Sequence, residues 1–406
     1  MKLKIIFLLN IFCIFTNLSA QVFQTPPILA FYLEDAPEIT SRAAVLIDAE
    51  TGALLYFKNG DEEIPPASMT KLMTMHLLMK AINEGRASYD ELIPITVESW
   101  AQSQPHRSSL MFLEPGQTVT LREIMLGLAV SSGNDAAVAA ALRLAPTMAD
   151  FSAMMTAEAR RLGLFVTRFT EASGISALNI TTAAEFALFC FHYIKNHPHS
   201  LKEFHSVQTF AYPAAVNEIE RFRNNPRTIS QENQNVLLRT FPGVDGLKTG
   251  FIFESGYNIA LTAERNQTRF ILVLMGAPSQ RGGSRIRAED STRILTWAFD
   301  NFKTVRPSVP QIENVPLWKG KLNNVELKLA ESTVFTSSAN RANILNYEVV
   351  IPQPLVAPLP AGFLAGYLYI SDENGELHKT PLVTAAAYEK GNIFKRIWHS
   401  ILLLFK

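Results

Sequence analysis

The chain has 406 residues, and its 37 lysines and arginines balance its 37 aspartates and glutamates, so the formal net charge is zero. This balance argues against nucleic acid as a partner, because proteins that bind nucleic acid usually carry a basic face. The hydrophobic fraction of 48% excludes a disordered chain. A chain of this length favours two domains over one.

Residues 1–20 have the composition of a secretory signal peptide. Lys2 and Lys4 precede an apolar run from Ile5 to Phe15, and Leu18-Ser19-Ala20 offers small residues to a signal peptidase. The apolar run is too short for a good membrane-spanning helix, so we expect cleavage and export, with a retained membrane anchor as the alternative.

Cleavage would remove Cys13 and leave Cys190 without a partner in the chain, so no disulfide is expected. The apolar residues 184–191 favour a buried helix face, which makes Cys190 a structural thiol and not a nucleophile. His197-Pro198-His199 is interpreted as a solvated loop. Metal binding is the weaker alternative there, because no cysteine or carboxylate stands at ligand spacing beside it.

Residues 21–303 show helices interrupting a set of strands, which predicts an α/β layered domain. Two early strands form a hairpin, Ala43–Ile47 and Ala53–Phe57. Helices are predicted over Met69–Asn83, Leu121–Leu144, Thr147–Leu162 and Glu289–Phe302. Later strands are predicted over Val236–Leu238, Tyr257–Thr262 and Arg269–Leu274.

The composition changes after this domain. Residues 304–315 hold two prolines and no periodic pattern, which predicts a linker. Residues 316–388 show short alternating runs broken by proline and glycine, which predicts a small all-β domain. Residues 389–406 are predicted to form an amphipathic helix.

The terminal helix has the composition of a membrane-interface segment. Trp398 stands among apolar residues at helical spacing and basic residues that occupy much of the remainder. The apolar set is Ile393, Phe394, Ile397, Ile401, Leu404 and Phe405, and the basic set is Lys395, Arg396, His399 and Lys406. The alternative is a structural helix packed on the all-β domain.

Three short motifs carry the chemistry, and the first is Ser68-Met69-Thr70-Lys71 at the start of a helix. Ser68 and Lys71 lie one turn apart and share a face. A buried lysine has a lowered pKa and can accept a serine proton, and the helix N-terminus favours an oxyanion nearby. Because chance matches are common, an N-cap serine followed by a solvated lysine is the alternative.

The other two motifs are Ser132-Gly133-Asn134 and Lys248-Thr249-Gly250, the latter on an expected edge strand. A serine hydroxyl can relay a proton, and an asparagine amide can hold a substrate carbonyl and a lysine. Lysine and threonine suit a substrate carboxylate, and the glycine lets a substrate backbone approach closely. Alone, Ser132-Gly133-Asn134 would be better explained as a helix–turn boundary.

In this order, the three motifs are similar to those of penicillin-binding proteins and serine β-lactamases. Over about residues 40–300, the chain resembles the low-molecular-mass penicillin-binding proteins of the D-alanyl-D-alanine carboxypeptidase family. The flanking strings 43–48, 65–74 and 244–250 strengthen the resemblance. It implies a β-lactamase-like fold with an antiparallel sheet flanked by helices, a β accessory domain and a membrane anchor. Ile252 stands where the family usually has threonine.

The resemblance also implies a reaction. Lys71 would deprotonate Ser68, which would attack the carbonyl of the penultimate D-alanine of a peptidoglycan peptide stem. The backbone amides of Ser68 and Phe251 would form the oxyanion hole. Ser132 would pass a proton to the departing D-alanine, and Asn134 would hold the substrate. Water would then release the acyl-enzyme, and β-lactam antibiotics would acylate the same serine.

The resemblance implies that Lys248 and Thr249, with Gly250 beside them, bind the terminal carboxylate of the substrate. Arg287 looks like the family's arginine beneath the active-site lysine and would assist them. No metal or organic cofactor is implied. The expected location is the periplasm or the wall-facing side of the cytoplasmic membrane, with peripheral attachment to lipid through the terminal helix.

Three other functions are compatible with the motifs. A D,D-endopeptidase would share the chemistry and differ in what the cleft admits. A β-lactamase would share the motifs but normally lacks the β domain and the anchor. An inactive wall-binding module would have a broken motif, and all three motifs are intact.

Overall fold

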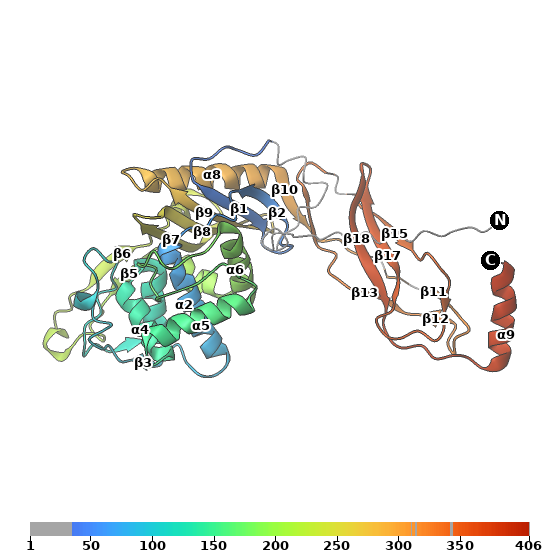
Figure 1. The fold of residues 1–406 in the computed structure, drawn as a ribbon, viewed down its shortest axis with the longest axis horizontal. Helices are drawn as coiled ribbons and strands as arrows, with labels where there is room; N and C mark the ends of the chain where they lie inside the picture. The colour runs from blue at the N-terminus through green and yellow to red at the C-terminus, as the bar shows by residue number, and fades with distance from the viewer. Residues whose placement is uncertain (1–34, 310, 313–314, 342–343, 406) are drawn as a thin grey trace, which may run out of the picture.

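The computed structural model describes residues 35–309, 311–312, 315–341 and 344–405. The expected signal peptide, including Cys13, lies outside these residues. The molecule is elongated: an α/β domain at one end is followed by a smaller β domain, and helix α9 (Ile393–Leu402) lies at the other end (Figure 1).

The α/β domain is built on a five-stranded antiparallel sheet in the order β2-β1-β9-β8-β7. Its strands are β1 (Ala43–Asp48), β2 (Leu54–Lys58), β7 (Val244–Ile252), β8 (Gly256–Arg265) and β9 (Thr268–Ala277). The early hairpin and the two later strands of the sheet are therefore confirmed. The strand that carries Lys248 is an edge strand, as expected, so one of its sides is open to a ligand.

The middle strand β9 is an apolar run because helices cover both of its faces. Phe270, Leu272 and Leu274 belong to one hydrophobic core, together with residues of α8 (Gly283–Asn301). Ile271 and Val273 point the other way and belong to a second core, with residues of α2 (Lys71–Asn83) and α6 (Ala183–Asn196). The alternation of side chains along a strand explains this division. Figure 1 shows α8 on one side of the sheet and α2, α4, α5 and α6 on the opposite side.

The pattern over residues 121–144 is not one helix. It comprises α3 (Leu121–Leu126), a π turn (Gly127–Ser131) and α4 (Asn134–Leu144), and α5 (Met148–Arg161) follows. The break falls at Ser132, whose φ of 55° is left-handed, and at Gly133, which has no room for a Cβ atom beside the Met111 backbone. The second motif therefore lies in a strained turn between two helices.

Two smaller expectations were wrong. Val236–Leu238 is not a strand, because helix α7 spans Leu237–Thr240 and the Asn235 side chain accepts the Leu237 N–H at 3.2 Å, which starts a helical turn. Periodicity cannot assign so short an apolar run.

His197 is not solvated: it is buried, and its Nε2 lies 2.9 Å from Nδ1 of His76. By contrast, Cys190 lies buried in α6, as expected, and burial raises the pKa of its thiol.

Two small hairpin-like sheets flank the helical part. They pair β3 (Leu92–Ile93) with β4 (Val119–Thr120), and β5 (Thr209–Tyr212) with β6 (Ile229–Glu232).

The second domain is all-β and has its own apolar core. Its strands are β10 (Phe302–Val305), β11 (Val315–Trp318), β12 (Asn324–Val325), β13 (Leu327–Leu329), β14 (Phe335–Ser338), β15 (Asn346–Val350), β16 (Leu355–Val356), β17 (Leu364–Asp372) and β18 (Gly375–Thr384). Thr304 and Val305, expected at the start of a linker, lie in β10, which pairs with β14. Buried Asp48 accepts the hydroxyls of Thr304 and Thr336 at 2.7 and 2.9 Å, which fastens both strands to the end of β1.

Helix α9 contacts the β domain through its polar residues. His399 Nδ1 accepts the backbone N–H of Lys319 at 2.9 Å, and Lys395 Nζ donates to Asn323 Oδ1 at 2.8 Å. Ile397, Ile401 and Leu404, which the alternative would pack onto this domain, are exposed. The apolar face of α9 is therefore directed away from the domain that holds it.

Candidate active site

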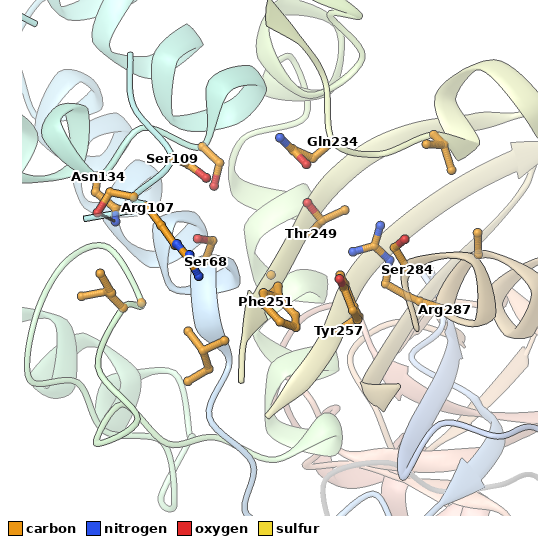
Figure 2. Close-up of a pocket in the computed structure, with 18 of the residues that line it drawn as sticks. Ser68, Arg107, Ser109, Asn134, Gln234, Thr249, Phe251, Tyr257, Ser284 and Arg287 are labelled. Carbon is orange, nitrogen blue, oxygen red and sulfur yellow. Dashed lines mark hydrogen bonds between the residues drawn. The ribbon is translucent and has the colours of Figure 1, made fainter. Parts of the chain in front are cut away.

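A cleft of about 630 Å³ brings the three motifs together. It lies where the first turn before α2, the break before α4, strand β7 and the start of α8 meet (Figure 2). The described residues that line it are Ser68, Arg107, Ser108, Ser109, Ser132, Asn134, Gly174, Ile175, Gln234, Val236, Thr249, Gly250, Phe251, Ile252, Tyr257, Ser284, Arg285, Arg287 and Ala288.

Ser68 and Lys71 form the centre of the site. Ser68 lies in a short 3-10 helix, Ala67–Thr70, and Lys71 is the first residue of α2. Lys71 Nζ lies 3.1 Å from Ser68 Oγ, 2.8 Å from Asn134 Oδ1 and 2.6 Å from the Ser173 carbonyl oxygen. The first two motifs therefore meet at one amino group, and Lys71 is buried, not solvated.

The environment of Lys71 favours a neutral amine. Burial lowers the pKa of Lys71 to about 7, although the charges of Glu171 and Asp135 act in the opposite direction. A neutral amine has two N–H donors and one lone pair. The Asn134 and Ser173 oxygens can take the two donors, which leaves the lone pair for the Ser68 hydroxyl proton. The arrangement can therefore activate Ser68 as a nucleophile.

The backbone around Ser68 is closely covered. A Cβ atom on Gly250 would lie 2.6 Å from the Pro66 carbonyl oxygen and 3.0 Å from the Ser68 nitrogen. A Cβ atom on Gly174, whose φ is 85°, would lie 1.8 Å from the Ala67 carbonyl oxygen. These glycines allow β7 and the loop that contains Ser173 to approach Ser68.

The third motif lies beside the cleft on β7. Lys248 is buried and donates to the Thr249 carbonyl oxygen at 3.1 Å. Burial, followed by the positive charge of Lys71, lowers the pKa of Lys248 well below its ordinary value. The side chain of Thr249 faces the cleft (Figure 2). A bound anion would relieve the repulsion between the two lysines.

Arg287 approaches the same region from α8. It is buried, its Nη1 donates to the Asn258 carbonyl oxygen at 3.4 Å, and its Nε has no partner among the described residues. Burial lowers the pKa of Arg287 to about 10, so the side chain stays charged at neutral pH. The Tyr257 ring lies below its guanidinium carbon at 5.8 Å and contacts the Phe251 ring, with 4.2 Å between centroids and 31° between the ring planes.

Not every predicted residue joins the hydrogen-bond network. Ser132 lines the cleft, but no hydrogen bond among the described residues connects its hydroxyl to Lys71 or Lys248. Lys71 and Lys248 are themselves absent from the lining, because both are buried behind it.

Sequence reasoning missed the residues that hold these groups in place. The Glu171 carboxylate accepts the backbone N–H groups of Ser173 and Gly174 at 2.6 and 2.7 Å and so fixes the loop that contacts Lys71. The Asn134 side chain donates to Ser108 Oγ at 3.1 Å. Neither segment carries a recognisable motif. The only available signal was Asp135, an acid directly after the second motif at the start of a helix.

Comparison with known proteins agrees with the chemistry that the geometry of the cleft indicates. The family model described as D-alanyl-D-alanine carboxypeptidase matches residues 32–279, and that of the penicillin-binding protein 5 C-terminal domain matches residues 302–390. The chain is 30% identical over 378 residues to the D-alanyl-D-alanine carboxypeptidase DacC of Escherichia coli, covering 91% of this chain and 90% of that protein. It is 32% identical over 371 residues to DacD of Salmonella typhimurium, covering 89% and 90%.

Among solved structures, penicillin-binding protein 5 of Haemophilus influenzae is similar with a TM-score of 0.76 and 27% identity, over 87% of this chain and 99% of that one. The likeness covers both domains. The two family models, the relatives and the shared fold agree with the assembled motifs, and the chain belongs to the D-alanyl-D-alanine carboxypeptidase family of serine hydrolases.

Proposed function

We propose that this protein removes the terminal D-alanine from peptidoglycan pentapeptide stems through an acyl-enzyme on Ser68. One observation carries the proposal: the amino group of Lys71 is buried, has a pKa of about 7, and lies 3.1 Å from Ser68 Oγ. A serine beside such an amine is an activated nucleophile at neutral pH.

In acylation, Lys71 takes the Ser68 proton while Ser68 Oγ attacks the carbonyl of the penultimate D-alanine. The carbonyl oxygen becomes negative and is stabilised by the backbone N–H groups of Ser68 and Phe251. The carbon–nitrogen bond then breaks, and the leaving amine receives a proton through Ser132. The left-handed turn that places Ser132 at the edge of the cleft supports this role. Water attack on the ester returns Ser68 and completes the hydrolysis.

The terminal carboxylate of the substrate binds where the cations gather. Lys248, Thr249 and Arg287 offer an amino group that a bound carboxylate would keep protonated, a hydroxyl, and a guanidinium whose Nε has no partner among the described residues. Charge-assisted hydrogen bonds to a carboxylate are stronger than neutral ones. The same groups would hold the carboxylate of penicillin while Ser68 opens its lactam ring. The curated relatives that are about 30% identical over most of the chain are named carboxypeptidases, which favours a carboxypeptidase over an endopeptidase.

The decisive experiment gives the purified protein a disaccharide pentapeptide and weighs the products. We expect release of one D-alanine per stem and, separately, a penicilloyl adduct on Ser68. Ser68→Ala should abolish both while the folded state persists. Release of a whole peptide from a cross-linked dimer would indicate an endopeptidase, and rapid turnover of penicillin would indicate a β-lactamase. An adduct on another residue would refute the assignment of Ser68.

The location is part of the proposal. The protein is exported by residues 1–20, and α9 attaches it peripherally to the outer face of the cytoplasmic membrane. No helix in the described part of the chain is long and apolar enough to span a membrane. The support for a surface attachment is the exposure of Phe394, Trp398 and Phe405, between 60% and 85%. Such a helix lies in the interface with its apolar face in the lipid.

A further inference from the structure

One arginine of the cleft is not used by the proposed reaction. Arg107 lines the cleft with Ser68, and in Figure 2 its guanidinium group points toward Ser68, which lies between Arg107 and Arg287. The side chain is exposed, and its guanidinium has no hydrogen-bond or ion-pair partner among the described residues. A cation is therefore directed at the reacting centre with no protein carboxylate to neutralise it.

The loop that carries Arg107 is fixed to the catalytic motif. Ser108 Oγ accepts from the Asn134 side chain at 3.1 Å, and the Ser109 carbonyl oxygen accepts the Asn134 backbone N–H at 2.8 Å. The buried Asp135 carboxylate accepts two further backbone N–H groups along the loop, at 2.8 and 3.0 Å. Arg107 is therefore presented to the cleft by a supported loop, as a group that recognises a ligand must be.

The backbone of Arg107 is strained. Its φ is 67°, in the left-handed region that glycine adopts freely and side chains with a Cβ atom avoid. Residues held in such conformations gather at functional sites, where the surrounding structure maintains them. Since the Arg107 side chain makes no stabilising polar contact within the described protein, a ligand is the partner that explains its placement.

The charge of the cleft specifies the chemistry of that ligand. Among the described residues that line the cleft, three are arginines and none is acidic. In the proposed reaction the terminal carboxylate lies toward Arg287. The rest of the peptide, which stays on Ser68, must extend the other way, toward Arg107. An arginine at that place suits a second carboxylate, which its guanidinium can bind in forked geometry.

We propose that Arg107 binds a carboxylate of the acyl peptide, upstream of the bond that is cut, and makes the enzyme selective for anionic stems. The inference rests on the proposed function, because that function sets the direction of the peptide in the cleft. A stem peptide can offer this carboxylate from its second residue or from the side chain of its third.

The test compares three pentapeptides: one with both carboxylates free, one amidated at the second residue and one amidated at the third. The readout is kcat/KM for D-alanine release. We expect one amide to react about threefold to tenfold more slowly than the free acid, as for a partly exposed ion pair. Arg107→Gly should remove this preference, and because φ is 67° the glycine variant should fold normally. The preference should also shrink as salt is raised.

Arg285→Ala is the matched control. It removes one positive charge from the same cleft lining, and the Arg285 side chain is 78% exposed and only loosely paired with Glu289 at 3.5 Å. It should leave the ratio of kcat/KM between the free and the amidated peptides unchanged. The amide that loses rate identifies the residue that Arg107 contacts.

Several results would overturn the inference. These are equal rates for all three peptides in the unaltered enzyme, a preference that persists in Arg107→Gly, or equal loss of the preference in Arg285→Ala. Failure of the unaltered enzyme to release D-alanine from any peptide is a different result, because it would contradict the proposed function and the inference with it.

Discussion

At the scale of single residues, the proposed reaction depends on a lysine without a neighbouring acid. Within the described residues, no carboxylate lies in ion-pair distance of Lys71 Nζ, which contacts a hydroxyl, an amide oxygen and a carbonyl oxygen. Burial therefore outweighs the more distant charges of Glu171 and Asp135, and the pKa of Lys71 falls to about 7. A lysine with its ordinary pKa would almost always be protonated at neutral pH and could not accept the proton of Ser68.

A pH dependence follows from the pKa of Lys71. In the proposed reaction the reactive form is the neutral amine. The rate of penicillin acylation should therefore rise with pH, level off above about 7, and fall roughly tenfold per pH unit in the acid range. The measurement is the second-order rate constant of acylation from pH 5.5 to 8.5 at fixed ionic strength. Melting temperatures over the same range are the control. A constant rate throughout, with the fold intact, would show that Lys71 is not the base.

At the scale of elements, the site depends on how closely separate segments approach. The loop containing Gly174 lies against the short helix that presents Ser68, and β7 lies against the same helix at Gly250. Ser68 is thus enclosed by backbone from two directions. Glycine is required at these two positions because the neighbouring backbone leaves no room for a Cβ atom. The local secondary structure alone would not require it.

Gly174→Ala tests this enclosure. Its φ of 85° and the 1.8 Å approach of a Cβ atom to the Ala67 carbonyl oxygen combine strain with overlap. The matched control is Gly85→Ala, where φ is 70° but no atom lies within 4 Å, so only backbone strain of about 1–2 kcal/mol is expected. Gly174→Ala should lower the free energy of unfolding by more than the control and suppress penicillin labelling, while Gly85→Ala should still be labelled. Denaturant unfolding and labelling with a fluorescent penicillin measure both effects. Equal behaviour of the two variants would show that the enclosure is unimportant.

The difference between local patterns and contacts between distant segments explains how much of the structure the sequence can predict. Ser68 and Lys71 share a face because of the helix period, and the strands of the sheet follow from apolar runs bounded by turns. The Ser173 carbonyl oxygen reaches Lys71 across 102 residues of sequence, and no local pattern encodes that contact. The single helix predicted over Leu121–Leu144 was wrong, although the second motif taken alone indicated a helix–turn boundary. The apolar pattern continues through Ser132, and a steric contact of Gly133 with another segment decides the backbone.

At the scale of the whole molecule, the β domain separates the catalytic cleft from α9. Hydrogen bonds from Thr304 and Thr336 to Asp48 join the two domains, and α9 is joined to the β domain by Lys395 and His399. Figure 1 shows α9 at the end of the molecule farthest from the α/β domain. An enzyme attached to a membrane through α9 would thus hold its cleft away from the lipid, toward the peptides of the wall.

The membrane attachment can be tested without removing α9, because its polar residues contact the β domain and its apolar residues are exposed. Trp398 and Phe394 are 60% and 81% exposed, so replacing both with serine should leave the melting temperature unchanged. Each large apolar side chain contributes about 1.5–3 kcal/mol on burial, so the double variant should bind liposomes at least about tenfold more weakly.

His399→Ala is the matched control, since it removes the hydrogen bond to Lys319 but keeps the exposed apolar face. It should lower the melting temperature and preserve sedimentation with liposomes. Vesicles with anionic lipid should bind more protein than neutral ones, because basic residues flank the apolar face. If Phe394→Ser with Trp398→Ser binds vesicles as well as the unaltered protein does, α9 is not the attachment, and the assignment of the cleft is unaffected.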